Sequence, residues 1–266
     1  MTAALQDDMA LLLSAVEAGA KIAREFYVKG ARVWDKDGGK GPVTEADLAV
    51  NALLKERLHD ARPDYGWLSE ETADDSARLN AQRAWIVDPI DGTRAFIRQR
   101  PQWTVCGALI ENGMPVAGAV VNPLTEEVFA ASLGGGAHLN GQPIRVSACT
   151  SLDHARLMGP REFYTHPSWP EPWPATMQLD NPNSIAYRLC LVASGARDAT
   201  VRVFSCHEWD VAAADLVVRE AGGIMTGLEG EMLVYNQPNP ILRGYIAAGP
   251  GLYSELKRRV DQRARA

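Results

Sequence analysis

The segment 85–93 reads Trp85-Ile86-Val87-Asp88-Pro89-Ile90-Asp91-Gly92-Thr93, an apolar run that ends in two closely spaced aspartates. The apolar residues predict a short buried strand, and Pro89 predicts a turn because proline cannot donate to a strand ladder. Two carboxylates on one turn repel each other unless a cation lies between them. Gly92-Thr93 then opens a predicted helical turn, whose free N–H groups favour an anion. The segment therefore predicts a divalent-metal site beside a phosphate site, although an Asx-type turn would also explain Asp88 and Asp91.

The composition is that of an ordinary globular protein. The 266 residues are 46% hydrophobic and 23% charged, with a formal net charge of -6. No lysine-arginine block precedes Lys257-Arg258-Arg259, so a nucleic-acid polymer is not an expected partner. No apolar run approaches the roughly 20 residues that span a bilayer, no basic segment precedes the first apolar stretch, and the four cysteines form no CxxC pair. We expect a soluble, reduced, cytoplasmic protein that binds a small molecule.

Hydrophobic spacing predicts a chain of the α+β or α/β class in two parts. The first part, 1–147, has amphipathic helices over about 2–28 and from Thr44 to before Pro63, with Leu48 on the buried face of the second. It continues as β-rich runs with hairpin dipeptides, which predict an antiparallel sheet covered by both helices on one face. The second part, 148–266, alternates helices over 184–193 and 208–221 with short strands. Within it, 161–182 is rich in proline and tryptophan and is predicted to be an irregular surface loop.

Three further segments carry carboxylates that a metal site could use. Asp47 follows Thr44 by three positions, Glu70-Glu71 follows a short apolar run, and Asp210 opens the helix predicted from 208. Each has an ordinary structural explanation. Asp47 completes a capping box, Asp210 caps a helix, and an acidic pair after a strand is usually a solvated turn. Taken singly, these alternatives stay open.

In order and spacing the segments resemble the inositol monophosphatase superfamily of metal-dependent, lithium-sensitive phosphatases. The resemblance covers nearly the whole chain and includes Glu70-Glu71, the core 88–93, Trp209-Asp210, the helix end 220–223 and the hairpin 136–141. It implies a layered αβαβα sandwich of the inositol monophosphatase and fructose-1,6-bisphosphatase type. It further implies a magnesium-dependent phosphomonoesterase, and family members often form homodimers.

The resemblance also implies residue roles. Glu70, Asp88 and the carbonyl of Ile90 would hold a first Mg²⁺, and Asp88, Asp91 and Asp210 a second, within a total of two or three ions. Glu70 and Thr93, with Thr93 hydrogen-bonded to Asp47, would orient and activate a water that attacks phosphorus directly. The amides of Gly92 and Thr93 would bind phosphate oxygens.

The substrate is predicted from the positions at which this chain differs from other members of the superfamily. Inositol monophosphatases usually carry a glutamate seven positions before the Trp-Asp aspartate, whereas this chain has Val203 there. They also usually have Asn-Phe shortly after Asp-Gly-Thr, whereas this chain has Arg94-Ala95-Phe96. Bacterial 3′(2′),5′-bisphosphate nucleotidases are more similar at Arg94, at Trp103-Thr104-Val105 and at Arg188. We therefore expect 3′-phosphoadenosine 5′-phosphate to be hydrolysed to AMP, since a bisphosphate needs an extra cation. The expected substrate contacts are Gly92, Thr93, Ser184, Arg188, Arg202 and Asp210, although ordinary surface charge would also explain the two arginines.

Several alternatives remain at this stage. Histidinol-phosphate phosphatases share Asp-Gly-Thr-Arg-x-Phe, and inositol 1-phosphate or fructose 1,6-bisphosphate hydrolysis belongs to the same superfamily. A catalytically silent binding or regulatory protein on this fold is the alternative of another class. Such a protein would be expected to have lost a ligand, whereas this chain retains the whole acidic set.

Overall fold

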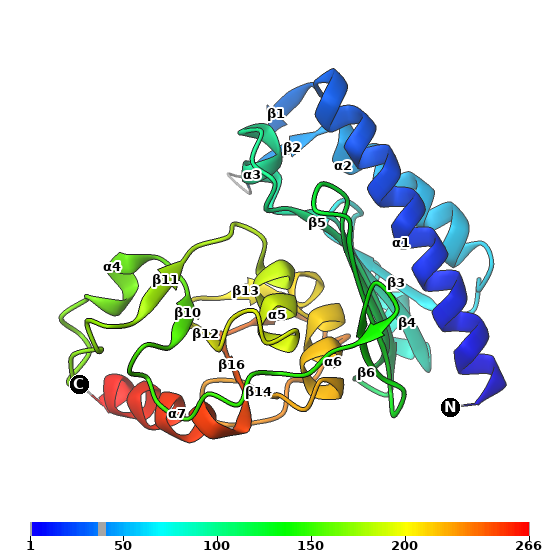
Figure 1. Ribbon diagram of the computed structural model, residues 1–266. Coiled ribbons are helices and arrows are strands. Elements are labelled where there is room, and N and C mark those ends of the chain that lie inside the picture. Colours follow the sequence, from blue (N-terminus) through cyan, green and yellow to red (C-terminus); the bar gives the residue numbers. More distant parts are fainter. Residues whose placement is uncertain (1, 37–40, 266) are drawn as a thin grey trace.

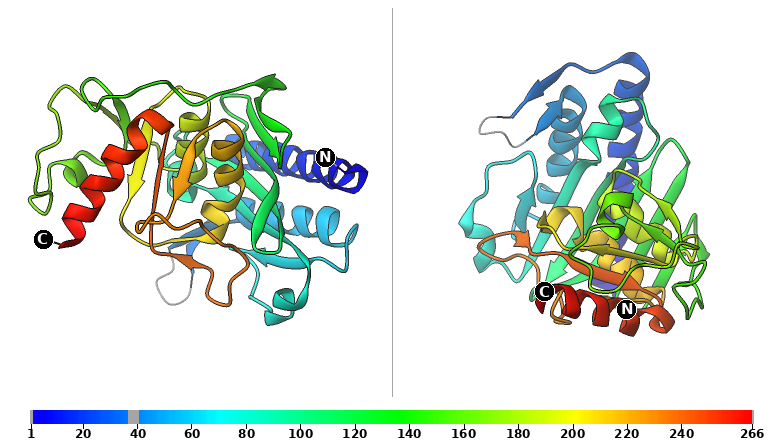
Figure 2. Two further views of the ribbon diagram at one scale, coloured as in Figure 1. Left: turned by 90° about the horizontal axis from the view of Figure 1, so that it is seen from below. Right: turned by 90° about the vertical axis from the view of Figure 1, so that its left-hand side faces the viewer.

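The computed structural model describes residues 2–36 and 41–265. Its elements lie in five layers, which Figure 1 shows from upper right to lower left. Helices α1 (Ala3–Lys29) and α2 (Glu45–Leu54) form the first layer, and α5 (Ile185–Ala193) and α6 (Ala212–Glu220) form the third, between two sheets. Helix α7 (Pro250–Arg265) covers the second sheet, so α1 and α7 lie at opposite ends of the stack (Figure 2). The predicted αβαβα sandwich is confirmed.

The first layer forms because two capped amphipathic helices cover one face of the first sheet. The Thr2 hydroxyl accepts the Leu5 N–H at the start of α1, and the predicted capping box of Thr44 and Asp47 begins α2. Leu12 and Val16 of α1 are fully buried in the core beneath them. The prediction for Leu48 is wrong, because its side chain is 44% exposed on the outer side of α2.

The first sheet contains seven strands within the described ranges, in the order β3-β4-β5-β6-β7-β8-β9. All neighbours are antiparallel except β3 and β4, which are parallel. Parallel pairing brings the carboxyl ends of β3 and β4 to one edge, with Ser69 opposite Val87. Glu70 and Asp88 therefore leave the sheet side by side. The bounds are β3 Gly66–Ser69, β4 Arg83–Asp91, β5 Thr104–Glu111, β6 Met114–Asn122, β7 Glu127–Ser132, β8 Gly136–Leu139 and β9 Gln142–Pro143.

The central helices pack closely on this sheet. A Cβ at Gly118 of β6 would lie 2.6 Å from the carbonyl oxygen of Ala213 in α6, so only glycine permits this approach. The closeness of α6 to the sheet matters because Asp210 lies just before that helix, in the short 3₁₀ turn Glu208–Asp210.

The second sheet has the order β11-β10-β12-β16-β14. Its strands are β10 (Arg156–Met158), β11 (Gln178–Asp180), β12 (Ala199–Arg202), β14 (Ile224–Thr226) and β16 (Tyr245–Ala248). Two small antiparallel pairs complete the strands: β1 (Val33–Asp35) with β2 (Pro42–Thr44), and β13 (Cys206–His207) with β15 (Ile241–Leu242).

The segment 161–182 is not the predicted irregular surface loop. It contains α4 (Arg161–Tyr164) and β11, and it buries Trp169 and Trp173 to 7% and 8% exposure. The two indoles pack edge to face with centroids 5.1 Å apart, and Arg259 and Arg263 of α7 lie over their rings. The prediction failed because proline content indicated a loop, whereas the aromatic side chains supply a small core of their own.

The connection from β9 to β10, residues 144–155, joins the two sheets. The boundary expected at 147 falls in this connection and stays a prediction. Helices α5 and α6, which belong to the expected second part, share one hydrophobic core with the first sheet. Among the described residues, no helix is long and apolar enough to cross a membrane.

Candidate active site

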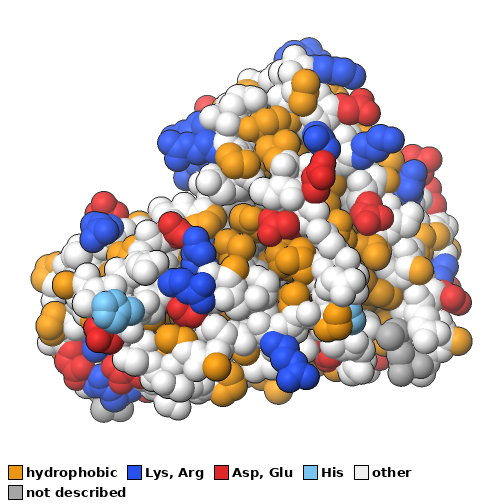
Figure 3. Space-filling view, viewed as in Figure 1, with side chains coloured by type: hydrophobic (Ala, Val, Ile, Leu, Met, Phe, Trp, Pro, Cys, Tyr) orange, Lys and Arg blue, Asp and Glu red, His pale blue; other side chains and the backbone are white. Residues whose placement is uncertain are grey.

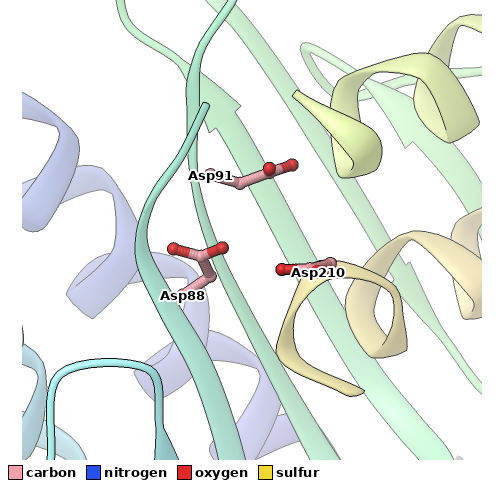
Figure 4. Close-up of side chains that lie close together, drawn as sticks. All are labelled: Asp88, Asp91 and Asp210. Carbon is pink, nitrogen blue, oxygen red and sulfur yellow. The ribbon is translucent and has the colours of Figure 1, made fainter. Parts of the chain in front are cut away.

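Three aspartates from two distant parts of the chain converge at the edge of the first sheet (Figure 4). Asp88 and Asp91 come from the end of β4, where the pairing register with β5 shifts between them. Asp210 comes from the 3₁₀ turn before α6. One oxygen of each carboxylate can be chosen such that all three lie within 4.8 Å of one another.

Within residues 2–36 and 41–265, no basic side chain neutralises this triad. Among the described residues, none of the three carboxylates forms an ion pair with a basic side chain. Burial raises the pKa of Asp88 well above its usual value, and the charges of Glu70, Asp91 and Asp210 raise it further. Burial likewise raises the pKa of Asp210 well above its usual value, and the negative charge of Asp91 raises it further. Asp88 and Asp91 are buried and Asp210 is half-buried, and a mutually repelling oxygen donor set of this kind fits a hard divalent cation.

Hydrogen bonds hold the aspartates in place. Asp91 Oδ2 accepts from Ser184 Oγ at 2.6 Å and from the Ala186 N–H at 2.7 Å, both at the start of α5. Burial raises the pKa of Asp91 to about 6, although these two bonds oppose the shift. Ser184, a predicted substrate contact, is fully buried, and its hydroxyl also accepts the Tyr187 N–H. In this structure it therefore positions Asp91.

Asp210 serves two purposes at once. Its Oδ2 accepts the His207 N–H at 2.9 Å and so caps the 3₁₀ turn, and the same carboxylate belongs to the triad. The cap that the sequence suggested for α6 is not formed by Asp210, because the N-cap of α6 is Val211 and receives no side-chain hydrogen bond. Capping thus orients the ligand instead of competing with that role.

Glu70 lies beside the triad but outside the group of three. Its Oε1 is 2.7 Å from Lys36 Nζ, and that ammonium is also 2.6 Å from Glu71 Oε1. Burial raises the pKa of Glu71 to about 7, while the hydrogen bond from Lys36 opposes the shift. Sequence reasoning missed Lys36, because a single lysine beside a glycine-rich segment carries no motif.

Thr93 and Asp47 connect the site to the first layer. Thr93 Oγ1 is 3.0 Å from the carbonyl oxygen of Ile90 and 3.3 Å from Asp47 Oδ1. The other oxygen of Asp47 accepts both the N–H and the hydroxyl of Thr44. Burial raises the pKa of Asp47 to about 6, against the effect of the Thr44 hydrogen bonds. Asp47 therefore caps α2 with one oxygen and reaches Thr93 with the other.

Gly92 shapes the backbone between the aspartates and α3 (Thr93–Ile97). Its φ is +99°, a left-handed value that favours glycine. A Cβ there would lie 3.0 Å from the carbonyl oxygen of Gln102 and 3.3 Å from the Ser184 nitrogen. The tight approach keeps the β4 end and the start of α5 together.

The acidic residues open into a hollow of about 190 Å³. It is lined by Gly41, Pro42, Glu70, Asp88, Ile90, Asp91, Gly92, Thr93, Arg94, Asn183, Ile185 and Asp210. Asn183 and Arg94 are lining residues that the sequence did not single out as contacts. Figure 3 shows basic side chains on both sides of the depression between the upper and lower parts of the molecule, near α3 and near β11.

A second hollow of about 180 Å³ contains both predicted arginines. It is lined by Pro160, Phe163, Asn181, Arg188, Val201, Arg202, Val203 and Phe204. Arg188 donates to the Pro182 carbonyl and to Asn181 Oδ1, and Arg202 donates to the Ser205 carbonyl. Among the described residues neither arginine has a carboxylate partner. Segment 181–183 separates the hollows, since Asn181 lines one and Asn183 the other.

A buried carboxylate triad on this layered fold defines a metal-dependent phosphatase. The family model described as "Inositol monophosphatase family" matches residues 6–262, and the chain belongs to that family. It is therefore a metal-dependent phosphoric monoester hydrolase, and the catalytically silent alternative is set aside.

Individual relatives carry different substrate names. A histidinol-phosphatase of Mycobacterium tuberculosis is 34% identical over 84% of this chain and 88% of its own length. The 3′(2′),5′-bisphosphate nucleotidase CysQ of Haemophilus influenzae is 30% identical over 87% of this chain and 88% of its own length. An IMPase structure from Thermotoga maritima superimposes with a TM-score of 0.84 at 26% identity, covering 97% of this chain and 98% of that one. The names of these relatives refer to different substrates, and the comparisons therefore leave the substrate of this chain open.

Proposed function

We propose that the enzyme removes the 3′-phosphate of a nucleoside 3′,5′-bisphosphate, with 3′-phosphoadenosine 5′-phosphate as the substrate and AMP as the product. The observation that carries this proposal is the second hollow, next to the acidic site, where Arg188 and Arg202 have no carboxylate partner in the described part of the chain. A scissile phosphate in the acidic hollow would leave the second phosphate of the substrate within reach of these guanidinium groups. Charge-assisted bonds of this kind are the strong ones in phosphate recognition.

The two arginines also face one buried group, which supports their being neighbours. Arg202 pairs with Tyr245 across β12 and β16. The charges of both Arg188 and Arg202 act against the rise that burial causes in the pKa of the Tyr245 hydroxyl. A pair of adjacent cations needs an anion to offset their mutual repulsion.

The alternatives fit this hollow less well. Histidinol phosphate carries an ammonium group and no second phosphate, so two unpaired arginines disfavour it. Inositol 1-phosphate lacks a second anion, and Val203 offers no side-chain polar atom to a polyol hydroxyl. Fructose 1,6-bisphosphate has a second phosphate, and the arginines alone do not separate it from a nucleotide.

The metal set proposed for the site is two or three Mg²⁺ ions, held by Glu70, Asp88, Asp91, Asp210 and the carbonyl oxygen of Ile90. Three of these carboxylates already converge, and no basic side chain from the described part of the chain forms an ion pair with them. When bound, the ions would supply Lewis-acid stabilisation of the charge that develops on the phosphoryl oxygens.

The chain's own groups would orient the reaction. The amides of Gly92 and Thr93 would bind phosphate oxygens, because the left-handed Gly92 lets the backbone approach closely. The Thr93 hydroxyl, held between Asp47 and the Ile90 carbonyl, would orient the attacking water, and Asp47 with Glu70 would accept its proton. The water oxygen bonds to phosphorus as the bond to the 3′ oxygen breaks, and that oxygen then takes a proton. We further propose lithium inhibition, a homodimer and a cytoplasmic location.

A phosphate-release panel tests the substrate. Purified enzyme is assayed with 3′-phosphoadenosine 5′-phosphate, inositol 1-phosphate, histidinol phosphate and fructose 1,6-bisphosphate, with Mg²⁺ and with EDTA. The nucleotide should have the highest kcat/KM. Arg188→Ala and Arg202→Ala should each raise its KM by about 10-fold to 100-fold, since a hydrogen bond to a charged group contributes about 1.5–3 kcal/mol. Arg161→Ala, an exposed residue of α4 outside both hollows, is the matched control. Equal or better turnover of another ester would contradict the proposal.

A further inference from the structure

Phe204 is an exposed aromatic side chain at the edge of the arginine hollow. Its side chain is 62% exposed, and no aromatic ring among the described residues packs against it. Single exposed apolar side chains are common on protein surfaces, but this ring borders two hollows, one of which contains Arg188 and Arg202, and that position makes it a candidate ligand contact.

The chain around Phe204 is held in a fixed shape. Arg202 donates through Nε and Nη2 to the Ser205 carbonyl, at 3.3 and 2.8 Å, and so closes a turn over residues 202–205. Val203 is half-buried against the apolar cluster beneath the second sheet. The turn therefore presents Phe204 outward from a supported base.

Phe204 and Val203 form a ridge between two hollows. On one side lies the hollow of Arg188 and Arg202, and on the other lies a hollow of about 520 Å³ that Leu228 and Val260 also line. The ridge therefore combines an apolar face with a cationic side. It suits a flat ring attached to an anion better than a polyol, because rings pack on rings while hydroxyl groups need polar partners.

We propose that Phe204 is a specificity-determining residue, and that the flat heterocyclic ring of the leaving group packs against its exposed face while the second anion of the leaving group binds Arg188 and Arg202. This inference rests on the proposed function and adds to it the part of the substrate that a sugar bisphosphate lacks. It explains how the site separates a nucleotide from fructose 1,6-bisphosphate, which the arginines alone do not.

The test compares two bisphosphates that differ only in the ring. Adenosine 3′,5′-bisphosphate and 1-deoxyribose 3,5-bisphosphate are assayed by phosphate release with wild type, Phe204→Ala and Phe204→Trp. Leu133→Ala, an exposed apolar residue that follows β7, is the control for loss of surface hydrophobicity. Wild type should have a KM about 10-fold lower for adenosine 3′,5′-bisphosphate, since stacking of a base on an aromatic side chain is a contact of roughly this size.

Phe204→Ala should remove this difference by raising KM for the nucleotide alone, with kcat changed less than about twofold. Phe204→Trp should retain it, and Leu133→Ala should behave as wild type. If wild type hydrolyses both bisphosphates with equal KM, or if Phe204→Ala raises both values equally, the ring contact is refuted while bisphosphate hydrolysis stands. If wild type hydrolyses neither bisphosphate but cleaves another ester of the panel, the proposed function fails and this inference fails with it.

Discussion

Replacing Asp88 by asparagine separates the two consequences of a buried carboxylate triad, charge repulsion and metal binding. Asp88 is buried and has Glu70, Asp91 and Asp210 as charged neighbours. Asparagine keeps the shape and can still accept the Ile90 N–H, which now bonds Asp88 Oδ1 at 3.0 Å. Without metal, the variant should therefore be at least as stable as wild type, because one of the repelling charges is gone.

With metal, the order should reverse. A ligand that binds only the folded state stabilises it by about 2.7 kcal/mol when present at 100 times its Kd. For a chain of this size, that corresponds to a rise in Tm of roughly 5–10 °C. Wild type should show this rise between EDTA and saturating Mg²⁺, and Asp88→Asn should show almost none. Phosphate release by the variant should fall by about 10³-fold or more, a barrier increase of roughly 4 kcal/mol.

Thermal unfolding followed by circular dichroism, in EDTA and in Mg²⁺, measures both effects on the same samples. Asp60→Asn, which removes an exposed aspartate that does not line the acidic hollow, controls for net charge. Near-normal turnover of Asp88→Asn, or an equal rise in Tm with Mg²⁺ for variant and wild type, would refute the assignment of Asp88 as a metal ligand.

Three further changes test separate parts of the structure. Gly92→Ala should lower stability by about 1–3 kcal/mol in urea unfolding and reduce activity, because a side chain at φ +99° is strained and its Cβ meets the Gln102 carbonyl oxygen; unchanged stability would contradict this reading. Thr93→Val should lower kcat for phosphate release by about 10²-fold with little change in the unfolding midpoint, since only the hydroxyl is lost; an unchanged kcat would remove Thr93 from the chemistry. Burial tends to raise the pKa of Asp198, but the hydrogen bonds from the Arg156 side chain and backbone N–H outweigh it and hold that pKa below its usual value. The stability from this pair should therefore be fully present above about pH 4 and be lost as the pH falls through the lowered value. Asp198→Asn should lower the free energy of unfolding by about 2 kcal/mol at pH 7, and that free energy should then fall less steeply with decreasing pH than in wild type. If the free energies of unfolding of the two proteins depend on pH in the same way, the pair does not contribute to the pH dependence.

The first helices, the antiparallel sheet and the pairing of Asp88 with Asp91 were predictable from the sequence because they rest on local patterns, whereas the αβαβα layering was implied by the resemblance. The capping box at Thr44 and the 3.6-residue spacing of α1 are read from neighbouring residues. The turn predicted at Pro89 is instead an irregularity within β4, and Asp88 and Asp91 lie on its two sides, so their proximity still follows from three positions of sequence. Asp210 was placed by resemblance alone, since nothing local says that residue 210 meets residue 88.

What could not be predicted depends on contacts between distant segments. The parallel pairing of β3 with β4, which brings Glu70 beside Asp88, is set by the connection 70–82 and leaves no alternating pattern. The burial of Trp169 and Trp173 depends on the arginines of α7, nearly ninety positions later. Lys36 and the exposure of Phe204 belong to the same category, because a single residue in a turn carries no periodic signal.

The arrangement of the site explains how one family accommodates different substrates at similar overall identity. The carboxylates are held by the close-packed parts of the molecule, at the end of β4 and before α6, where Gly92 and Gly118 leave no room for change. The groups proposed to choose the leaving group instead line the second hollow, where Arg188 of α5 is half-buried and Phe204 of the turn 202–205 is exposed. On the proposal made above, substitution there would alter which molecule fits without disturbing the packing that holds the carboxylates. Relatives named as a histidinol-phosphatase and as a bisphosphate nucleotidase, at 34% and 30% identity to this chain, are compatible with that proposal.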